Sequence, residues 1–197
     1  MSTRRPGPIV IGRGKYVELV DVNGWEFVHR HASSGVVVII ATTEDGSLLL
    51  VEQPRLPIRG RSIELPAGLV GDLSGSENES FELAAARELE EETGFRATRW
   101  RKILEAPTSP GLSSELVSFF RATGLVRVGP GGGDATEDIT VHVVPIPQVP
   151  AFLTSKIAEG IAVDPKIFAG LYFIDGAWPL ASSSPAAPTS ADRSGGA

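Results

Sequence analysis

The feature that most constrains the fold is an uninterrupted apolar run at residues 36–41, inside the β-branched segment 35–42. The run is far shorter than the roughly 18 residues that a membrane-spanning helix needs, but it matches the length of a strand. A strand that is apolar at every position, instead of at alternate positions, is buried on both of its faces. The run therefore predicts a buried central strand, around which the chain builds a sheet.

The segments on either side of this run mix strands with helices. Further strands are expected at residues 15–22, 25–29, 47–53, 63–65, 100–105, 115–122 and 138–144. Helices are expected at about residues 79–93, 149–159 and 165–173, the last with Asp164 as its cap and Pro165 at its first position. This mixture predicts an α+β protein, a mixed α/β/α sandwich.

The chain divides into unequal parts. Its 197 residues predict one domain with a small appendage. We expect a small N-terminal β-strand subdomain with a flexible start at residues 1–34, and the main domain at residues 35–180. Residues 181–197 are almost entirely Ser, Ala, Pro, Gly and Thr, which predicts a disordered tail.

Composition excludes several classes of protein. The chain has 18 Lys and Arg against 24 Asp and Glu, a net charge of −6, and no basic block, so nucleic-acid binding is not expected. It has no cysteine, which excludes a disulfide framework, a thiolate zinc site and a cysteine nucleophile. Residues 1–7 carry Arg4 and Arg5 without a following apolar segment, so a signal peptide is not expected. We expect a soluble, cytoplasmic protein that does not bind a membrane.

An acidic helix carries the candidate chemistry. Seven glutamates lie between residues 77 and 92, and Arg87 is the only base among them. In a helix, Glu88, Glu91 and Glu92 are at i, i+3 and i+4, so they share one face. Neighbouring carboxylates repel one another unless a cation lies between them, and Mg²⁺ prefers such oxygen ligands. The pattern indicates either a magnesium site or a solvated acidic face.

The ends of this helix have their own signals. Ser76 followed by Glu79 predicts a capping box at its start. Gly94 stands where a left-handed residue would end it. The helix is therefore expected at about residues 79–93.

The same segment resembles a known motif. After Glu79 and seven further residues, the chain reads Arg87-Glu88-Leu89-Glu90-Glu91-Glu92-Thr93-Gly94-Phe95. This is similar to the Nudix box of Nudix hydrolases, G-x5-E-x7-R-E-U-x-E-E-x-G-U, in which U is apolar. The glycine that opens the box would fall at Leu73, and its better counterpart is Gly68, which predicts a lengthened loop at residues 70–77. The resemblance implies the Nudix fold.

Other segments resemble the ADP-ribose pyrophosphatase branch of this family. They are Glu52-Gln53-Pro54-Arg55, Glu64-Leu65-Pro66-Ala67-Gly68, Pro110 (sixteen residues after Gly94), Ser114-Glu115 and Thr136-Glu137-Asp138-Ile139. Nucleotide-sugar pyrophosphatases, including GDP-mannose hydrolases, share much of this pattern. The resemblance implies hydrolysis of the pyrophosphate bond of ADP-ribose or a related ADP-sugar, giving AMP and a sugar phosphate. The alternative is a broader nucleotide-sugar pyrophosphatase.

The resemblance implies a metal site on the acidic helix. Glu88 and Glu92 would be ligands of Mg²⁺, or of Mn²⁺, with Glu91 as a ligand or support. The carbonyl of Ala67 would complete the shell. Arg87 would hold Glu91 by an ion pair, or else form an ordinary surface pair.

A catalytic glutamate is implied as well. Glu137 is the candidate general base or water-orienting residue, and the glycines at 131–133 would allow its loop to close over the substrate. Glu115 and Asp138 are the alternatives. His142 lies within a predicted strand and is expected to be structural.

Substrate contacts are implied at five further positions. Arg55 would contact a phosphate, which a forked guanidinium suits, and Glu64 would lie near the substrate ribose or the metal. Trp25 would either stack on the base or pack in the core. Pro110 and Gly111 would shape the loop that admits the terminal sugar.

The resemblance also bears on assembly and on the class of function. In this branch the N-terminal strands are exchanged between subunits, which implies a homodimer. Two other classes stay open: a Nudix-like sensor that binds without turnover, and an interaction scaffold that uses the acidic face.

Overall fold

The predicted central strand is strand β4 of the computed structural model, which describes residues 7–31, 33–72, 75, 78–133 and 136–174. Its sheet has the order β7-β4-β9-β8 and consists of β7 (Ala67–Val70), β4 (Gly35–Ala41), β9 (Leu116–Arg127) and β8 (Phe95–Pro107). β4 runs antiparallel to β7 and parallel to β9, and residues 37–41 are fully buried. The prediction of a buried central strand is confirmed.

A second sheet supplies the other half of the sandwich. Its order is β10-β5-β6-β11, formed by β10 (Thr140–Pro145), β5 (Ser47–Arg55), β6 (Gly60–Glu64) and β11 (Ala162–Val163). Short 3-10 helices follow two of these strands, at Leu56–Ile58 and Ile146–Gln148. β5 is antiparallel to β6 and β10, so this sheet joins segments far apart in the sequence.

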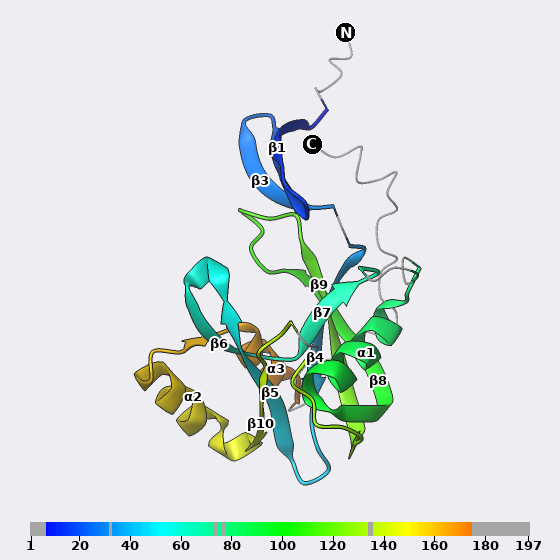
Figure 1. Ribbon diagram of the computed structural model, residues 1–197, viewed down its shortest axis with the longest axis vertical. Coiled ribbons are helices and arrows are strands. Elements are labelled where there is room, and N and C mark those ends of the chain that lie inside the picture. Colours follow the sequence, from blue (N-terminus) through cyan, green and yellow to red (C-terminus); the bar gives the residue numbers. More distant parts are fainter. Residues whose placement is uncertain (1–6, 32, 73–74, 76–77, 134–135, 175–197) are drawn as a thin grey trace.

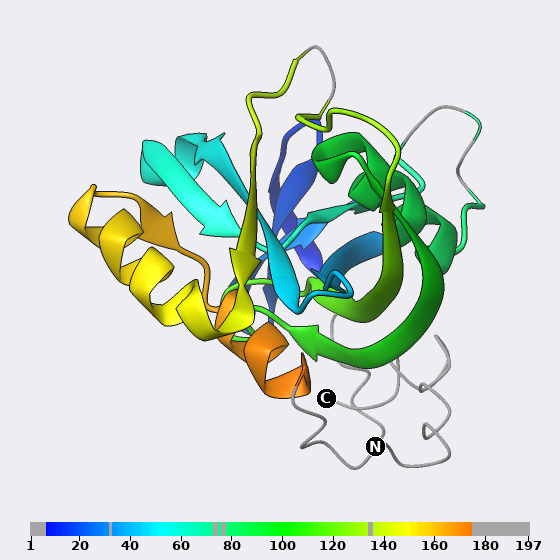
Figure 2. The same ribbon diagram turned by 90° about the horizontal axis from the view of Figure 1, so that it is seen from below.

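Three helices cover the sheets: α1 (Phe81–Thr93), α2 (Val149–Ala158) and α3 (Lys166–Ile174). α1 lies on one side of β4, and α2 and α3 lie on the other (Figures 1 and 2). Successive side chains of β4 serve the two sides in turn: Val38 packs in the cluster of Leu153 and Ile167, and Val37 packs in the cluster of Leu89. The predicted α+β sandwich is confirmed. Among the described residues, no helix is both long and apolar enough to cross a bilayer.

The N-terminal strands form a separate sheet at the top of Figure 1. It has the order β1-β2-β3, with β1 (Ile9–Arg13), β2 (Val17–Val22) and β3 (Trp25–Arg30). Asn23 and Gly24 join β2 to β3 with φ of +58° and +85°, the geometry that favours Asn-Gly in tight hairpins. The turn expected there is confirmed, whereas β1 has no counterpart among the predicted strands. The division of the chain at residues 34 and 180 stays a prediction, and the expected tail lies outside the described residues.

The start of α1 differs from the expectation. Its N-cap is Ser80, whose hydroxyl accepts a hydrogen bond from the Leu83 amide at 3.2 Å. The helix therefore begins two residues later than position 79. The capping box predicted from Ser76 and Glu79 is wrong, because Glu79 precedes the cap; Ser76 itself lies outside the described residues.

The end of α1 and the start of β7 give opposite outcomes. α1 ends as predicted at Gly94, which has φ of +73° and donates its amide to the Glu90 carbonyl. β7 was not expected, because Pro66 and Gly68 are residues that usually interrupt strands. Of the loop predicted at residues 70–77, Val70 belongs to β7, and residues 73–74 and 76–77 lie outside the described part of the chain.

Candidate functional site

The last turns of α1 and the start of β7 meet at the acidic face. Leu89 and two alanines of α1 are fully buried in the cluster beneath β4, and they fix the helix against the sheet. Glu92 consequently faces β7 and is only 3% exposed. Its carboxylate accepts a hydrogen bond from the Ala67 amide at 3.1 Å. Glu92 and the backbone of Ala67, both predicted at the metal site, are therefore neighbours.

Gly68 allows Glu88 to approach β7. A β-carbon at position 68 would lie 1.9 Å from Cδ of Glu88 and 2.1 Å from its Oε1, distances that exclude any larger residue without displacement of this carboxylate. The need for glycine at this position is thus a packing requirement of Glu88. It also explains how Gly68, far from the helix in sequence, serves the acidic face.

Arg87 is the centre of an ion-pair cluster. Its Nη1 donates to Glu88 at 2.8 Å and to Glu91 at 3.1 Å, and its Nε donates to Glu79 at 3.2 Å. Its Nη2 donates to the Leu69 carbonyl of β7 at 3.1 Å. Burial would lower the pKa of Arg87, but Glu79 and Glu88 raise it, so the guanidinium stays charged. Arg87 therefore joins the helix to β7, a larger role than the predicted pair with Glu91.

Two carboxylates of this face hold their protons more tightly than usual. Burial raises the pKa of Glu88 to about 7, although Arg87 acts in the opposite direction. Burial also raises the pKa of Glu92 well above its ordinary value, and the charge of Glu88 adds to the effect. Negative charge at these positions is thus only partly compensated by protein groups, a condition that a bound cation would relieve.

The donor set fits Mg²⁺ in chemistry. Glu88, Glu91 and Glu92 offer hard carboxylate oxygens, and the backbone of Ala67 adds a carbonyl. Within the described residues, no three Asp, Glu, His or Cys side chains converge on one point as a ready-made cage. Arg87 bonds to one oxygen of Glu88 and one of Glu91, so the second oxygen of each carboxylate is not engaged by Arg87.

A cavity of about 380 Å³ adjoins the acidic face. Ala67 and Gly68 line it together with Arg55 and Glu64, both of which were predicted at the substrate. Arg55 donates to Glu64 through Nε at 2.7 Å and Nη2 at 2.6 Å, and this pairing raises the pKa of the guanidinium. Lys166 of α3 also lines the cavity. The space is therefore lined by cationic side chains beside carboxylates, and cations of this kind bind phosphate oxygens.

The three candidates for the catalytic base lie in different places. Glu115 lines the cavity, where Arg30 donates to it at 2.7 Å. Asp138 is held by Arg61 at 2.6 Å. Glu137 lies at the C-terminal end of α1, and its charge contributes to the raised pKa of Glu92. Of the three, Glu137 is therefore the candidate whose charge is shown to act on Glu92.

The glycines before Glu137 serve close packing. The amides of Gly132 and Gly133 donate to the carbonyls of Glu92 and Glu91 at 2.8 and 3.0 Å, which caps the last turn of α1. A β-carbon at Gly133 would lie 2.2 Å from Oε2 of Glu137, so this carboxylate rests directly on the loop. The glycines thus bind the loop to the helix end in this structure, and the predicted closure of the loop over the substrate stays a prediction.

Trp25, Pro110 and Gly111 lie together at the N-terminal sheet. Nε1 of Trp25 donates to the Gly111 carbonyl at 3.3 Å, and the side chain is 63% exposed. The alternative that Trp25 packs in the core is therefore wrong. Of the described residues lining the 380 Å³ cavity, none is Trp25, Pro110 or Gly111.

Sequence reasoning missed Arg30 and Lys166 as cavity residues. Arg30 ends β3 and Lys166 opens α3, so they come from opposite ends of the chain. Neither stands in a motif, and only the folded chain brings them to one place. The Asp164 cap, by contrast, was predicted: it accepts from the Lys166 amide at 2.8 Å.

Comparison with known proteins agrees with this geometry. A family model described as NUDIX domain matches residues 31–161. The ADP-ribose pyrophosphatase of Mycobacterium tuberculosis (strain ATCC 25618 / H37Rv) is 38% identical over 131 residues, 66% of this chain and 61% of that protein. The ADP-ribose pyrophosphatase of Bacillus subtilis (strain 168) is 40% identical over 112 residues, 56% of this chain and 58% of its own. The chain thus spans less than two thirds of the length of these two relatives.

Two further similarities extend the comparison. The GDP-mannose pyrophosphatase of Enterobacter sp. (strain 638) is 34% identical over 159 residues, 74% of this chain and 80% of that protein. A crystal structure of an ADP compounds hydrolase superposes with a TM-score of 0.61 at 20% identity, over 89% of this chain and 96% of its own, and so shares the fold. With the family model covering well over half of its residues, the chain belongs to the NUDIX family, in the branch of ADP-ribose and nucleotide-sugar pyrophosphatases.

Proposed function

We propose that this protein is a hydrolase that cleaves the pyrophosphate bond of ADP-ribose or a related ADP-sugar, giving AMP and a sugar phosphate. The observation that carries the proposal is a pair of carboxylates with raised pKa values, the buried Glu92 and the partly buried Glu88, beside a cavity that contains Arg55. The ADP-ribose pyrophosphatases among the relatives support this substrate. The GDP-mannose pyrophosphatase supports the alternative, a broader nucleotide-sugar pyrophosphatase.

Mg²⁺, or Mn²⁺ in its place, would be held by Glu88, Glu91, Glu92 and the Ala67 carbonyl. When bound, it would supply positive charge to the phosphate oxygens. Arg87 would keep the helix and β7 in place around it, through its bonds to Glu88, Glu91 and the Leu69 carbonyl.

Glu137 would act on the attacking water. Water adds to one phosphorus, the bond from that phosphorus to the bridging oxygen breaks, and Glu137 accepts the proton that the water loses. Arg55 has five N–H donors, of which Glu64 engages two, so the others can face a phosphate oxygen. Glu64 would hold Arg55 in this orientation and lie near the ribose.

The remaining predicted contacts would fix the two ends of the substrate. Trp25 would stack on the base, because its exposed ring is free of the core while its indole N–H is fixed to Gly111. Pro110 and Gly111 would shape the loop that admits the terminal sugar.

A matched pair of variants on one helix tests this proposal. We expect Glu92→Gln to lower kcat for ADP-ribose at least about 100-fold, because it removes a metal ligand. Loss of a residue that only supports a ligand already costs about 10- to 100-fold. Glu90→Gln is the control, since the Glu90 side chain is partly exposed and accepts hydrogen bonds from Arg96, away from the metal site. Products are identified as AMP and ribose 5-phosphate, with GDP-mannose assayed beside them. Wild-type hydrolysis by Glu92→Gln would contradict the assignment.

The same assay separates the other classes of function. A sensor would bind ADP-ribose tightly without releasing AMP. An interaction scaffold would neither bind nor hydrolyse it, and Glu91→Gln would change nothing. Only the hydrolase is expected to release AMP from ADP-ribose, and this release should depend on Glu92.

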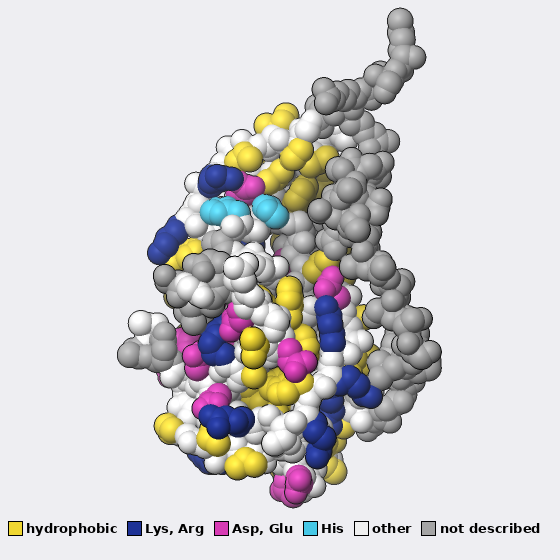
Figure 3. Space-filling view, turned by 90° about the vertical axis from the view of Figure 1, so that its right-hand side faces the viewer, with side chains coloured by type: hydrophobic (Ala, Val, Ile, Leu, Met, Phe, Trp, Pro, Cys, Tyr) yellow, Lys and Arg dark blue, Asp and Glu magenta, His cyan; other side chains and the backbone are white. Residues whose placement is uncertain are grey.

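We also propose a homodimer formed through the N-terminal sheet, which we take as a subdomain of residues 1–34 beside the main domain of residues 35–180. Apolar side chains gather on this sheet, at the top of Figure 3. The exposed ones are Ile9, Val10, Ile11, Tyr16, Val17, Leu19 and Trp25. Such a patch is typical of a protein interface. We place the protein in the cytoplasm. We propose no nucleic-acid partner, because a net charge of −6 without a basic block disfavours binding to a phosphate backbone.

A further inference from the structure

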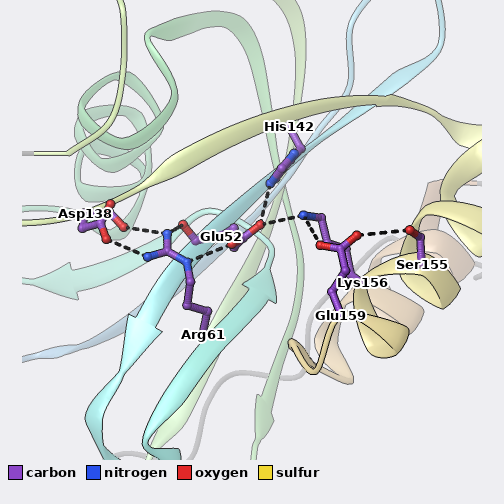
Figure 4. A network of polar contacts seen from close by, with 7 residues as sticks. All are labelled: Glu52, Arg61, Asp138, His142, Ser155, Lys156 and Glu159. Carbon is purple, nitrogen blue, oxygen red and sulfur yellow. Dashed lines mark hydrogen bonds and ion pairs between the residues drawn. The ribbon is translucent and has the colours of Figure 1, made fainter.

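A second cluster of charges lies away from the acidic face, around Glu52 of β5 (Figure 4). Glu52 is 8% exposed and contacts three nitrogen-bearing side chains: Arg61 Nε at 2.8 Å, His142 Nε2 at 3.1 Å and Lys156 Nζ at 3.1 Å. Burial alone would raise the pKa of Glu52, but Lys156, Arg61 and His142 together bring it below its ordinary value. Glu52 is therefore a fixed negative charge that anchors its neighbours.

Arg61 of β6 extends from this anchor to the segment that precedes β10. Its Nη1 donates to Oδ2 of Asp138 at 2.6 Å, and its Nη2 donates to the Asp138 carbonyl at 3.2 Å. The same guanidinium donates back to Glu52, through Nε to the carboxylate at 2.8 Å and through Nη2 to the carbonyl at 3.1 Å. Arg61 thus holds the side chain and the backbone of Asp138 against β5.

The exposure of Asp138 bears on what this contact is for. Its side chain is 72% exposed, and an ion pair with so exposed a partner contributes little to stability. The contact is therefore weak as a source of stability. Its geometry is nevertheless specific, because two donors of one planar group fix two atoms of one residue.

Asp138 is the residue next to Glu137. The Glu137 carboxylate rests on Gly133, whose amide caps the end of α1. Glu137 therefore lies between a contact with the loop on one side and the Arg61–Asp138 clasp on the other. A displacement of a reacting group by about 1 Å can cost about 100-fold in rate, so the clasp is suited to set the position of Glu137.

We infer that Arg61, anchored by Glu52, is a positioning residue that sets Glu137 toward the carboxylates of α1 by gripping Asp138. The inference rests on the proposed function, in which Glu137 receives the proton of the attacking water. Arg61 itself does not touch the reacting atoms.

The test is a double-mutant cycle on ADP-ribose hydrolysis by the full-length protein. We expect Arg61→Ala to lower kcat about 10- to 100-fold with KM changed less than about threefold, and Asp138→Ala to do the same. In the Glu137→Gln background, Arg61→Ala should cause no further loss, because its effect passes through Glu137. Arg61→Lys should recover little, since an ammonium cannot make the forked contact.

Lys156→Ala is the matched control. Lys156 contacts the same oxygen of Glu52 as His142 but not Asp138, so its loss should leave kcat within about twofold. Circular dichroism and urea unfolding of every variant exclude a folding defect as the cause.

The outcomes separate the two proposals. If the wild type hydrolyses ADP-ribose and Glu137→Gln impairs it, but Arg61→Ala keeps the wild-type kcat, the positioning role is overturned while the proposed function stands. The same holds if Arg61→Ala and Glu137→Gln reduce kcat additively, or if Lys156→Ala is as impaired as Arg61→Ala. A wild type without hydrolysis overturns the proposed function and the positioning role with it. A fully active Glu137→Gln overturns the role of Glu137, and with it the positioning role of Arg61, while the hydrolase activity stands.

Discussion

At the residue scale, the absence of one methyl group sets the approach of α1 to β7. The position that a β-carbon would occupy at Gly68 is filled by the Glu88 carboxylate, at 1.9 Å from Cδ. Because Glu88 is held on its other side by Arg87, it cannot turn away without breaking that bond. The site therefore depends on a glycine that has no chemistry of its own.

Gly68→Ala is expected to abolish most activity and to destabilise the fold by about 1–3 kcal/mol, because the new methyl group overpacks a closed contact. Urea unfolding and the ADP-ribose assay measure the two effects. Gly12→Ala is the control, since a β-carbon there has open space and Gly12 lies in β1. Equal activity of Gly68→Ala and wild type would contradict the described contact.

The raised pKa of Glu88 makes a prediction about stability. In the metal-free protein, the folded state keeps the Glu88 proton up to about pH 7, whereas the unfolded state loses it near the ordinary pKa of 4.5. The unfolded state therefore binds fewer protons between these values, and stability falls as pH rises through them. The resulting cost is absent below about pH 4.5 and complete above about pH 7, with a magnitude of about 1–3 kcal/mol.

Glu88→Gln removes this cost. In EDTA at pH 8, urea unfolding should find the variant more stable than the wild type by about 1–3 kcal/mol, and the difference should shrink at pH 5. Added Mg²⁺ should stabilise the wild type and not the variant. A variant that is less stable than wild type at pH 8 without metal would show that the Glu88 charge is already compensated.

At the scale of elements, the two ends of α1 were unequally predictable. The end at Gly94 follows from local backbone sterics, so a single glycine after the last apolar position sufficed. The start did not, because several residues before Phe81 could serve as a cap and only tertiary contacts select Ser80. Glu79, expected within the cap, instead pairs with Arg87.

Ser80→Ala is expected to lower stability by about 0.5–2 kcal/mol through loss of the bond to the Leu83 amide. Thermal unfolding measures the change. Ser155→Ala on α2, whose hydroxyl bonds an exposed glutamate, should change stability by less than about 0.5 kcal/mol. Equal melting temperatures for Ser80→Ala and wild type would place the cap elsewhere.

Strands show the same division between local and tertiary signals. β4 was predicted because every residue of the run is apolar, as a strand buried on both faces requires. β7 was missed because its length is four residues and Pro66 and Gly68 mask it; its pairing with β4 forms only in the folded sheet. The close packing of the 131–133 glycines against α1 was missed for a related reason: in sequence, a glycine required for close approach looks like one that confers freedom. Closure of their loop over the substrate stays a prediction.

At the scale of the whole molecule, long-range ion pairs join segments that no local pattern connects. Arg61 and Asp138 are 77 residues apart and Arg30 and Glu115 are 85 apart, so neither pair could be found from spacing. The carboxylates of α1 could be found, because helical periodicity alone brings them to one face. The motif residues were thus accessible from sequence, and the residues that orient them were not.

The exposed apolar side chains of the N-terminal sheet predict the assembly. Sedimentation velocity at micromolar concentration should give a dimer for the wild type and a monomer for Ile9→Glu, since a charge within the exposed apolar patch opposes its burial at an interface. Val126→Glu, at an exposed position of β9 in the main domain, should remain dimeric. A monomeric wild type would contradict the proposed interface.

The most direct test of the account is a crystal structure with Mg²⁺ and a nonhydrolysable ADP-ribose analogue. We expect metal density on the carboxylates of Glu88 and Glu92 and on the Ala67 carbonyl, with the diphosphate of the analogue between this metal and Arg55. Metal-free glutamates at both positions, with the analogue bound outside the cavity that Arg55 and Glu64 line, would contradict the central claim.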